Sequence, residues 1–321
     1  MANILITGAL GQVGSELIDF LLASYSGTIY ATDIHKESTL KSNPSVKYAV
    51  LDVRNREMVE NIIGENDIDE VYHLASILSA SGEKDPYMAY NVNLTGTVNV
   101  LNASVTRGVK KVFIPSTIGV FGPEVQKEKA PRRHASIPTT IYGITKAAGE
   151  MLFQYYYNKY NIDVRSLRYP GLLSYKVAPT AGTTDYAVDM IKHAASGNSY
   201  ECYLKDDTRL PMMYMPDAMN STLHLMTAPA ENIRVRTSYN VMSYSFTPRE
   251  LENELRELNP EFRVVYKPDF RQSIADSWPW SIDVTDAVND WEFKPVFDLK
   301  NTVSDMFQNY RKFSEKLNPP D

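Results

Sequence analysis

The chain has few of the residues from which disulfide frameworks and metal centres are built. It contains a single cysteine, Cys202, among 321 residues. No internal disulfide can form, and a cysteine-rich metal site is excluded. Five histidines are scattered without the spacing of a metal-binding pair: His35, His73, His134, His193 and His224. We therefore expect no metal site and a reducing compartment, and we place the protein in the cytoplasm.

Concentrated positive charge and long apolar runs are also missing. Lys and Arg total 33 against 39 Asp and Glu, which gives a net charge of −6. Nucleic-acid binding needs clustered cations to neutralise phosphates, so a nucleic-acid partner is not expected. A membrane span needs about 18 or more apolar residues in a row, and none is present. The chain opens on the apolar run Ile4–Ile6 without a basic leader, so we predict no targeting segment.

The first half does contain a regular alternation of short apolar runs and amphipathic stretches. Strands are predicted over residues 2–7, 29–32, 46–49, 70–74, 111–115 and 164–168, and helices are predicted to begin near residues 11, 57, 91 and 142. Such alternation is typical of a parallel sheet with helices on both faces. The predicted fold class is α/β, with a doubly wound parallel sheet of the Rossmann type.

The second half of the chain is richer in proline. After Pro170, nine prolines between positions 179 and 295 interrupt short helices and strands, which predicts a smaller mixed α/β portion. We expect residues 1–170 to form a dinucleotide-binding domain that carries the catalytic residues. Residues 171–321 are expected to form mainly the substrate-binding portion, with some segments returning to the first domain.

The loop after the first strand carries Gly8, Gly11 and Gly14 in the order GxxGxxG. Glycines here allow a tight turn and a close approach to a pyrophosphate, whose charge the following helix N-terminus can hold. Asp33 ends the second strand close to the ~20 residues downstream at which a carboxylate binds the adenosine ribose. That carboxylate would repel a 2′-phosphate, so NAD is predicted as the cofactor rather than NADP.

Tyr142 and Lys146 form a YxxxK pair, and residues four apart share one face of a helix. An ammonium beside the phenol is expected to lower the pKa of Tyr142, so that it can exchange a proton with a substrate alcohol. Ser116 and Thr117 close the fifth predicted strand, at the sheet edge where open α/β folds bind ligands.

These motifs, with Leu51-Asp52-Val53 and His73-Leu74-Ala75-Ser76, resemble the extended branch of the short-chain dehydrogenase/reductase superfamily over essentially the whole chain. The resemblance implies that Thr117 hydrogen-bonds the reacting oxygen, with Ser116 as the alternative, and that Lys146 also holds the nicotinamide ribose. The cofactor contacts that it implies are Gly8, Gly11, Gln12, Val13, Gly14, Asp33, Asp52, Val53, Leu74, Ala75, Ser76, Asn93, Ser116, Tyr142, Lys146 and Tyr169.

Residues 115–123, 166–171, 179–187 and 210–218 are further similar to the short-chain type of L-threonine 3-dehydrogenase. This similarity implies metal-free oxidation of the L-threonine hydroxyl by NAD to 2-amino-3-oxobutanoate, with Tyr142 as the base. Backbone amides and hydroxyls of residues 182–184 can bind a carboxylate. The expected substrate contacts are Ser79, Ser81, Thr117, Tyr142, Gly182, Thr183, Thr184 and Trp278.

Two other functions stay open on the sequence. A UDP-sugar 4-epimerase would need basic residues for the diphosphate, for which Arg209 and Arg234 are candidates. A non-catalytic NAD-binding protein of the same fold typically lacks the tyrosine or the lysine, and this chain has both. The resemblance also implies a homodimer that pairs through the helices predicted over residues 91–106 and 142–159.

Overall fold

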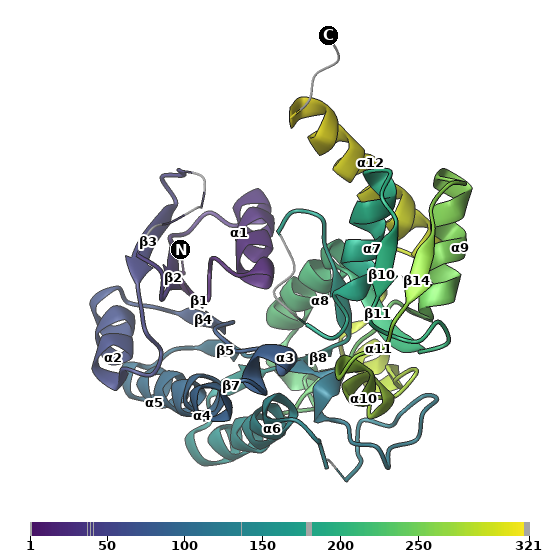
Figure 1. The fold of residues 1–321 in the computed structure, drawn as a ribbon. Coiled ribbons are helices and arrows are strands. Elements are labelled where there is room, and N and C mark those ends of the chain that lie inside the picture. The colour runs from purple at the N-terminus through teal and green to yellow at the C-terminus, as the bar shows by residue number, and fades with distance from the viewer. Residues whose placement is uncertain are drawn as a thin grey trace.

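The computed structural model describes residues 2–36, 38, 40, 42–135, 137–177 and 182–317. Residues 179–181, which belong to one of the similar stretches above, lie outside the described residues. At the centre is a six-stranded parallel sheet in the order β3-β2-β1-β4-β5-β7 (Figure 1). Its strands are β1 Ile4–Thr7, β2 Ile29–Asp33, β3 Val46–Val50, β4 Glu70–His73, β5 Lys111–Phe113 and β7 Asp163–Arg165. The predicted doubly wound α/β fold is confirmed.

Apolar residues point to both faces of this sheet because helices cover both. Ile4 and Ile6 pack on one side with α1 (Gln12–Ser24) and α8 (Met215–Thr227). Leu5, between them, packs on the other side with α2 (Arg56–Glu65), α5 (Gly96–Arg107) and α6 (Ile141–Tyr160). Figure 1 shows the two helical layers, with α1 and α8 above the sheet and α2, α5 and α6 below it. A strand that is buried on both faces explains the continuous apolar runs in the sequence.

The predicted strand over residues 164–168 is wrong in its second part. β7 ends at Arg165, and β8 (Leu167–Tyr169) belongs to a separate sheet of order β12-β8-β6. The neighbouring chain segment breaks at the same level, between β5 and β6 (Ser116–Thr117), where Pro115 cannot donate a ladder hydrogen bond. Both segments thus leave the central sheet together, and they stay paired through Ser116 with Arg168 and Thr117 with Tyr169.

A second core surrounds two small sheets, of order β13-β11-β9 and β10-β14, and it includes first-half residues such as Phe121 and Ala147. The strands are β9 Gly171–Leu173, β10 Tyr200–Cys202, β11 Leu210–Tyr214, β12 Tyr239–Asn240, β13 Tyr244–Phe246 and β14 Val264–Tyr266. The helices are α7 Tyr186–Ala195, α9 Pro248–Leu258, α10 Arg271–Asp276, α11 Thr285–Trp291 and α12 Leu299–Leu317, with a 3-10 turn η3 at Ala230–Asn232. In the first half, shorter elements complete the order: α3 Ser79–Gly82, α4 Pro86–Tyr90, the π-helix η1 Asn91–Thr95 and the 3-10 turn η2 Ile118–Val120.

Candidate active site

A cavity of about 440 Å³ opens where β1, β4 and β5 end, at the carboxyl edge of the sheet. This is the place at which open α/β sheets bind ligands. Residues from both halves of the chain line it. The predicted site residues among them are Gly8, Gly11, Gln12, Val13, Gly14, Leu74, Ser76, Ser79, Ser81, Ser116, Thr117, Tyr142, Lys146, Tyr169, Gly182, Thr183, Thr184 and Trp278.

The glycine loop has a shape that only glycines permit. Gly8 has φ +69°, and a Cβ atom there would lie 2.7 Å from the backbone nitrogen of Ala75. A Cβ atom on Gly14 would collide with the carbonyl oxygen of Gly8. Gly11 caps α1 without a side-chain hydrogen bond, so the first amides of the helix face the cavity side of the loop without a protein cap. This cradle fits the pyrophosphate of a dinucleotide.

Asp33 and Asp52 lie beside the cavity lining instead of within it. The Asp33 carboxylate is buried next to the glycine loop and accepts a hydrogen bond from the Leu10 amide at 3.1 Å. Arg54 Nη2 donates a hydrogen bond to Asp52 Oδ2 at 2.6 Å. This hydrogen bond holds the pKa of Asp52 below its ordinary value. Arg54 was not singled out from the sequence. The ribose and adenine contacts of these two carboxylates stay predictions.

The remaining predicted cofactor residues outside the lining support the cavity wall. Asn93, on the π-helix η1, accepts from the Ile77 amide at 2.8 Å and donates to the Ile77 carbonyl at 3.0 Å. It also donates to Thr145 Oγ1 at 3.3 Å, so it ties the loop after β4 to α6. Ala75 packs behind the lining against Gly8, whereas Val53 packs against Gly96 of α5. The structure thus places Asn93 and Ala75 behind the cavity wall and Val53 outside the lining.

The three predicted catalytic residues converge on the cavity. Helix α6 starts after Thr140, whose hydroxyl accepts from the Gly143 amide at 3.0 Å, and this start sets Tyr142 and Lys146 one turn apart. Lys146 Nζ lies 5.8 Å from the centre of the Tyr142 ring. Thr117 ends β6, where its hydroxyl accepts from the Gly119 amide at 3.1 Å.

The protonation of Tyr142 differs from the expectation. Burial raises the pKa of Tyr142 to about 12, and a hydrogen bond with Thr117 offsets only part of that effect. Burial also lowers the pKa of Lys146 to about 8. The predicted lowering of the Tyr142 pKa is therefore wrong, because removal of the phenolate from water raises the pKa by more than the Thr117 hydrogen bond lowers it.

Two predicted cofactor contacts use their hydroxyls elsewhere. Ser116 Oγ donates to Glu150 Oε1 at 2.5 Å, and the Tyr169 hydroxyl bonds Thr222 Oγ1. Both residues line the cavity, but their hydroxyls hold the wall together. Because the Ser116 hydroxyl is engaged with Glu150, Thr117 is the better candidate for contact with the reacting oxygen, and this assignment stays a prediction.

The predicted substrate residues form the opposite wall. Ser79 Oγ lies 3.3 Å from Thr183 Oγ1, which joins the loop after β4 to the loop after β9. The Gly182 amide donates to Asp185 Oδ2 at 2.6 Å, and the Gly182 carbonyl accepts from the Tyr203 hydroxyl at 3.3 Å. Asp185 also lines the cavity. Sequence reasoning missed it, although it directly follows the Thr183-Thr184 pair.

Trp278 is buried and lines the cavity, and its role in covering the substrate stays a prediction. Its position depends on Lys127, which sequence reasoning missed. Lys127 Nζ donates to the carbonyls of Asp276 at 2.6 Å and Trp278 at 3.0 Å. No sequence signal links these residues, because about half of the chain separates them.

The arginines considered for a diphosphate do not reach the cavity. Arg209 pairs with Glu250 at 2.5 Å, and Arg234 pairs with Asp290. Among the described residues that line the cavity, Lys146 is the one Lys or Arg side chain. Across all the residues that the structure describes, no cluster of three or more His, Cys, Asp or Glu is arranged to hold a metal ion. No helix in that part of the chain is long and apolar enough to cross a membrane.

Comparisons with known proteins show which sequences and structures this chain is similar to. A mitochondrial L-threonine 3-dehydrogenase of Bos taurus is 43% identical over 95% of this chain and 81% of its own length. A solved monomeric L-threonine 3-dehydrogenase from a metagenome is 45% identical, covers 97% of this chain and 100% of its own, and has a TM-score of 0.93. A UDP-glucose 4-epimerase from Thermotoga maritima, 23% identical over 98% of this chain and 100% of its own, shares the fold with a TM-score of 0.87. Residues 4–241 match the model of the NAD dependent epimerase/dehydratase family, to which the chain therefore belongs.

Proposed function

We propose that this protein is an NAD-dependent L-threonine 3-dehydrogenase, which oxidises the side-chain hydroxyl of L-threonine to give 2-amino-3-oxobutanoate. One observation carries the proposal: Thr117, Tyr142 and Lys146 share a cavity with the glycine loop. The names of the relatives described above point to the same substrate. When bound, NAD supplies the hydride acceptor of this oxidation.

The residues present fit that cofactor. The loop from Gly8 to Gly14 would hold the pyrophosphate, since Gly8 and Gly14 allow a tight turn in which any Cβ would collide with backbone atoms. Asp33 would bind the adenosine ribose, and Lys146 the nicotinamide ribose. We assign residues 1–170 to cofactor binding and catalysis, and residues 171–321 mainly to substrate binding.

The chemistry of the alcohol falls to three side chains. Thr117 would hold the substrate hydroxyl by a hydrogen bond, so that its proton points to Tyr142. Tyr142, as the phenolate, would accept that proton while the hydride leaves the substrate carbon. Lys146 would favour the phenolate through its positive charge. Because burial raises the pKa of Tyr142 to about 12, the reaction is expected to speed up with rising pH.

The opposite wall suits a small zwitterion. Ser79, Ser81, Thr183 and Thr184 offer neutral donors and acceptors, and Trp278 closes the space. A UDP-sugar carries a diphosphate, yet both candidate arginines are engaged by acidic partners outside the lining. This arrangement favours the amino acid over the sugar nucleotide as substrate.

The decisive assay follows NADH absorbance with purified protein, NAD and L-threonine, and UDP-glucose serves as the comparison substrate. We expect NADH formation with L-threonine and none with UDP-glucose. The Tyr142→Phe variant should lose turnover and keep NAD binding. Turnover of this variant at the parent rate would refute the role of Tyr142 as base, and a parent protein inert toward L-threonine would refute the proposed reaction.

We also infer a homodimer. An apolar strip on α4 and α6 faces outward, with Tyr87 77% exposed, Met151 66% exposed, and Tyr90, Ile144 and Tyr155 also exposed. Such a strip is typical of a protein interface. The Met151→Glu variant should sediment as a monomer, whereas Val296→Glu, at an exposed apolar position outside both helices, should not change the assembly. A parent protein that sediments as a monomer would refute the dimer.

We further propose a cytoplasmic location, because the chain has one cysteine, buried and unpaired, as suits a reducing compartment. Cell fractionation against compartment markers tests this location. Recovery of the protein in another compartment would refute it.

A further inference from the structure

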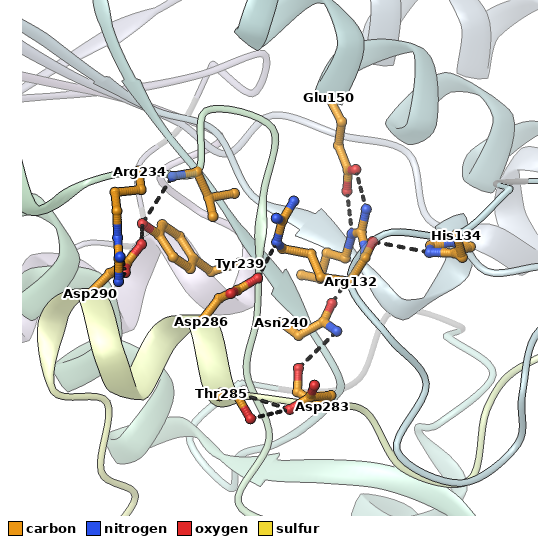
Figure 2. Close-up of polar contacts among 12 residues, drawn as sticks. Arg132, His134, Glu150, Arg234, Tyr239, Asn240, Asp283, Thr285, Asp286 and Asp290 are labelled. Carbon is orange, nitrogen blue, oxygen red and sulfur yellow. Dashed lines mark hydrogen bonds and ion pairs between the residues drawn. The ribbon is translucent and has the colours of Figure 1, made fainter.

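A buried ion pair lies directly behind the catalytic residues. Glu150 is on α6, one turn after Lys146, and Arg168 is on β8. Their side chains are 6% and 4% exposed, and neither lines the cavity. Figure 2 shows Glu150 above the polar cluster that connects it to Arg132, Asn240 and Asp283.

The pair binds two strands and one helix to one another. Glu150 Oε1 accepts from Ser116 Oγ at 2.5 Å and from Arg168 Nε at 2.8 Å. Glu150 Oε2 accepts from Arg168 Nη2 at 2.6 Å. These short hydrogen bonds to charged groups are shielded from water. Hydrogen bonds of this kind are strongest in such a water-free interior.

The far side of Arg168 is occupied as well. Its Nη1 donates to the Arg132 carbonyl at 2.8 Å and to Asn240 Oδ1 at 3.3 Å. Asn240 in turn donates to the Asp283 carbonyl at 3.0 Å (Figure 2). The guanidinium is thus fixed from two directions, and Glu150 has a rigid partner.

Ser116 connects this pair to the site. It immediately precedes Thr117, which would hold the substrate hydroxyl, and its oxygen is bound to the helix that carries Tyr142 two turns before Glu150. The Ser116–Glu150 bond therefore sets the end of β6 against α6. A buried ion pair adds little net stability compared with apolar packing, so stability alone does not account for its presence.

We propose that Glu150 and Arg168 are positioning residues that act through Ser116 to fix Thr117 relative to Tyr142. The inference rests on the proposed function, because it assigns these residues to the geometry of the same proton transfer. A misplacement of about 1 Å in such a site can cost on the order of 100-fold in rate.

The test compares Ser116→Ala with Ser166→Ala. Ser166 is a matched control, since it is also buried near β8 and its hydroxyl bonds only Ser238 Oγ, at 2.9 Å, among the described contacts. We expect Ser116→Ala to lower kcat about 10- to 100-fold with L-threonine and to enlarge the kinetic isotope effect of the C3-deuterated substrate. The NADH dissociation constant and the Tm of Ser116→Ala should match those of Ser166→Ala. Ser166→Ala should retain the parent kcat. Equal kcat in the two variants would overturn the proposal.

Glu150→Gln tests the charge. It keeps an oxygen for Ser116 but weakens the bond to Arg168, so its kcat should lie between those of the parent and Ser116→Ala. A Glu150→Gln variant with the parent kcat would overturn the role of the ion pair. Should this variant fail to fold, Ser116→Ala alone decides.

A crystal structure of Ser116→Ala separates this proposal from the proposed function. If the parent protein does not oxidise L-threonine, the proposed function fails, and the structure still measures the Thr117–Tyr142 geometry. A displaced Thr117 hydroxyl would support positioning, and an unchanged one would overturn it.

Discussion

Lys146 donates a hydrogen bond from Nζ to the carbonyl oxygen of Pro115 at 3.0 Å. The Lys146 ammonium is thus attached to the segment that leads into Ser116 and Thr117. This bond joins α6, which carries Tyr142 and Lys146, to the chain segment that carries Thr117.

We expect kcat/KM for L-threonine to rise between pH 7 and pH 9. Tyr142, with a pKa of about 12, is almost fully protonated at pH 7, and its ionised fraction grows about tenfold for each unit by which the pH rises toward 12. Loss of charge on Lys146, whose pKa is about 8, should flatten the upper part of the rise. Steady-state kinetics across this range in buffers of constant ionic strength measures the profile, and a flat profile would contradict the assignment of Tyr142 as base.

Gly8→Ala should abolish NAD binding. The new Cβ would meet the Ala75 backbone at 2.7 Å, so the loop would have to leave the shape that is proposed to hold the pyrophosphate. Gly108 is the matched control, since its φ of +71° carries the same backbone strain with nothing within 4 Å of a new Cβ. Gly108→Ala should cost about 1 kcal/mol of stability and leave NAD affinity unchanged. Calorimetric titration with NAD compares the two, and parent-like affinity in Gly8→Ala would exclude the loop as the cofactor cradle.

His73 should make the protein sensitive to acid. Burial lowers its pKa to about 3, while it bonds Thr7 Oγ1 at 2.7 Å and Thr97 Oγ1 at 3.2 Å. The unfolded chain binds a proton near pH 6.5, so the contribution of this residue is present above that pH and is lost as the pH falls toward 3, by about 1.4 kcal/mol per pH unit.

His73→Asn removes this titration. Its free energy of unfolding should fall less between pH 7 and pH 5 than that of the parent, as measured by urea denaturation. Equal losses in the two proteins would show that His73 is not the responsible group.

Lys127→Met should raise the KM for L-threonine several-fold and leave NAD affinity unaltered. The substitution frees the carbonyls of Asp276 and Trp278, so Trp278 loses its support at the cavity. Lys110→Met is a suitable control, because Lys110 is exposed and pairs with Asp69 just before β5 and β4 begin, at the edge of the sheet opposite the cavity. Initial-rate kinetics with each substrate varied in turn gives both constants, and an unchanged KM in Lys127→Met would rule out this support.

The parts of the fold that the sequence predicts are those with a local signal. The continuous apolar runs of β1 and β2 are buried on both faces, and the glycines at positions 8, 11 and 14 mark a turn of restricted shape. Tyr142 and Lys146 are recognisable because four residues make one helical turn. The break between β7 and β8 has no comparable signal in the local sequence. It arises because β8 pairs with β6, a segment about 50 residues earlier that follows Pro115.

The missed parts of the site depend on contacts distant in sequence or on burial. Glu150 and Arg168 are 18 residues apart, and nothing in either neighbourhood predicts that they meet. Lys127 and Trp278 are 151 residues apart. The direction of the Tyr142 pKa shift was mispredicted because the sequence shows the neighbouring lysine but not how completely the phenol is removed from water.

The position of α8 has a consequence for biosynthesis. This helix belongs to the second half of the chain but packs beside α1 on the central sheet. While the ribosome is still translating residues beyond 170, the apolar face that α8 will cover is bare. Nascent chains therefore pass through a stage at which chaperone binding or self-association competes with completion of the fold.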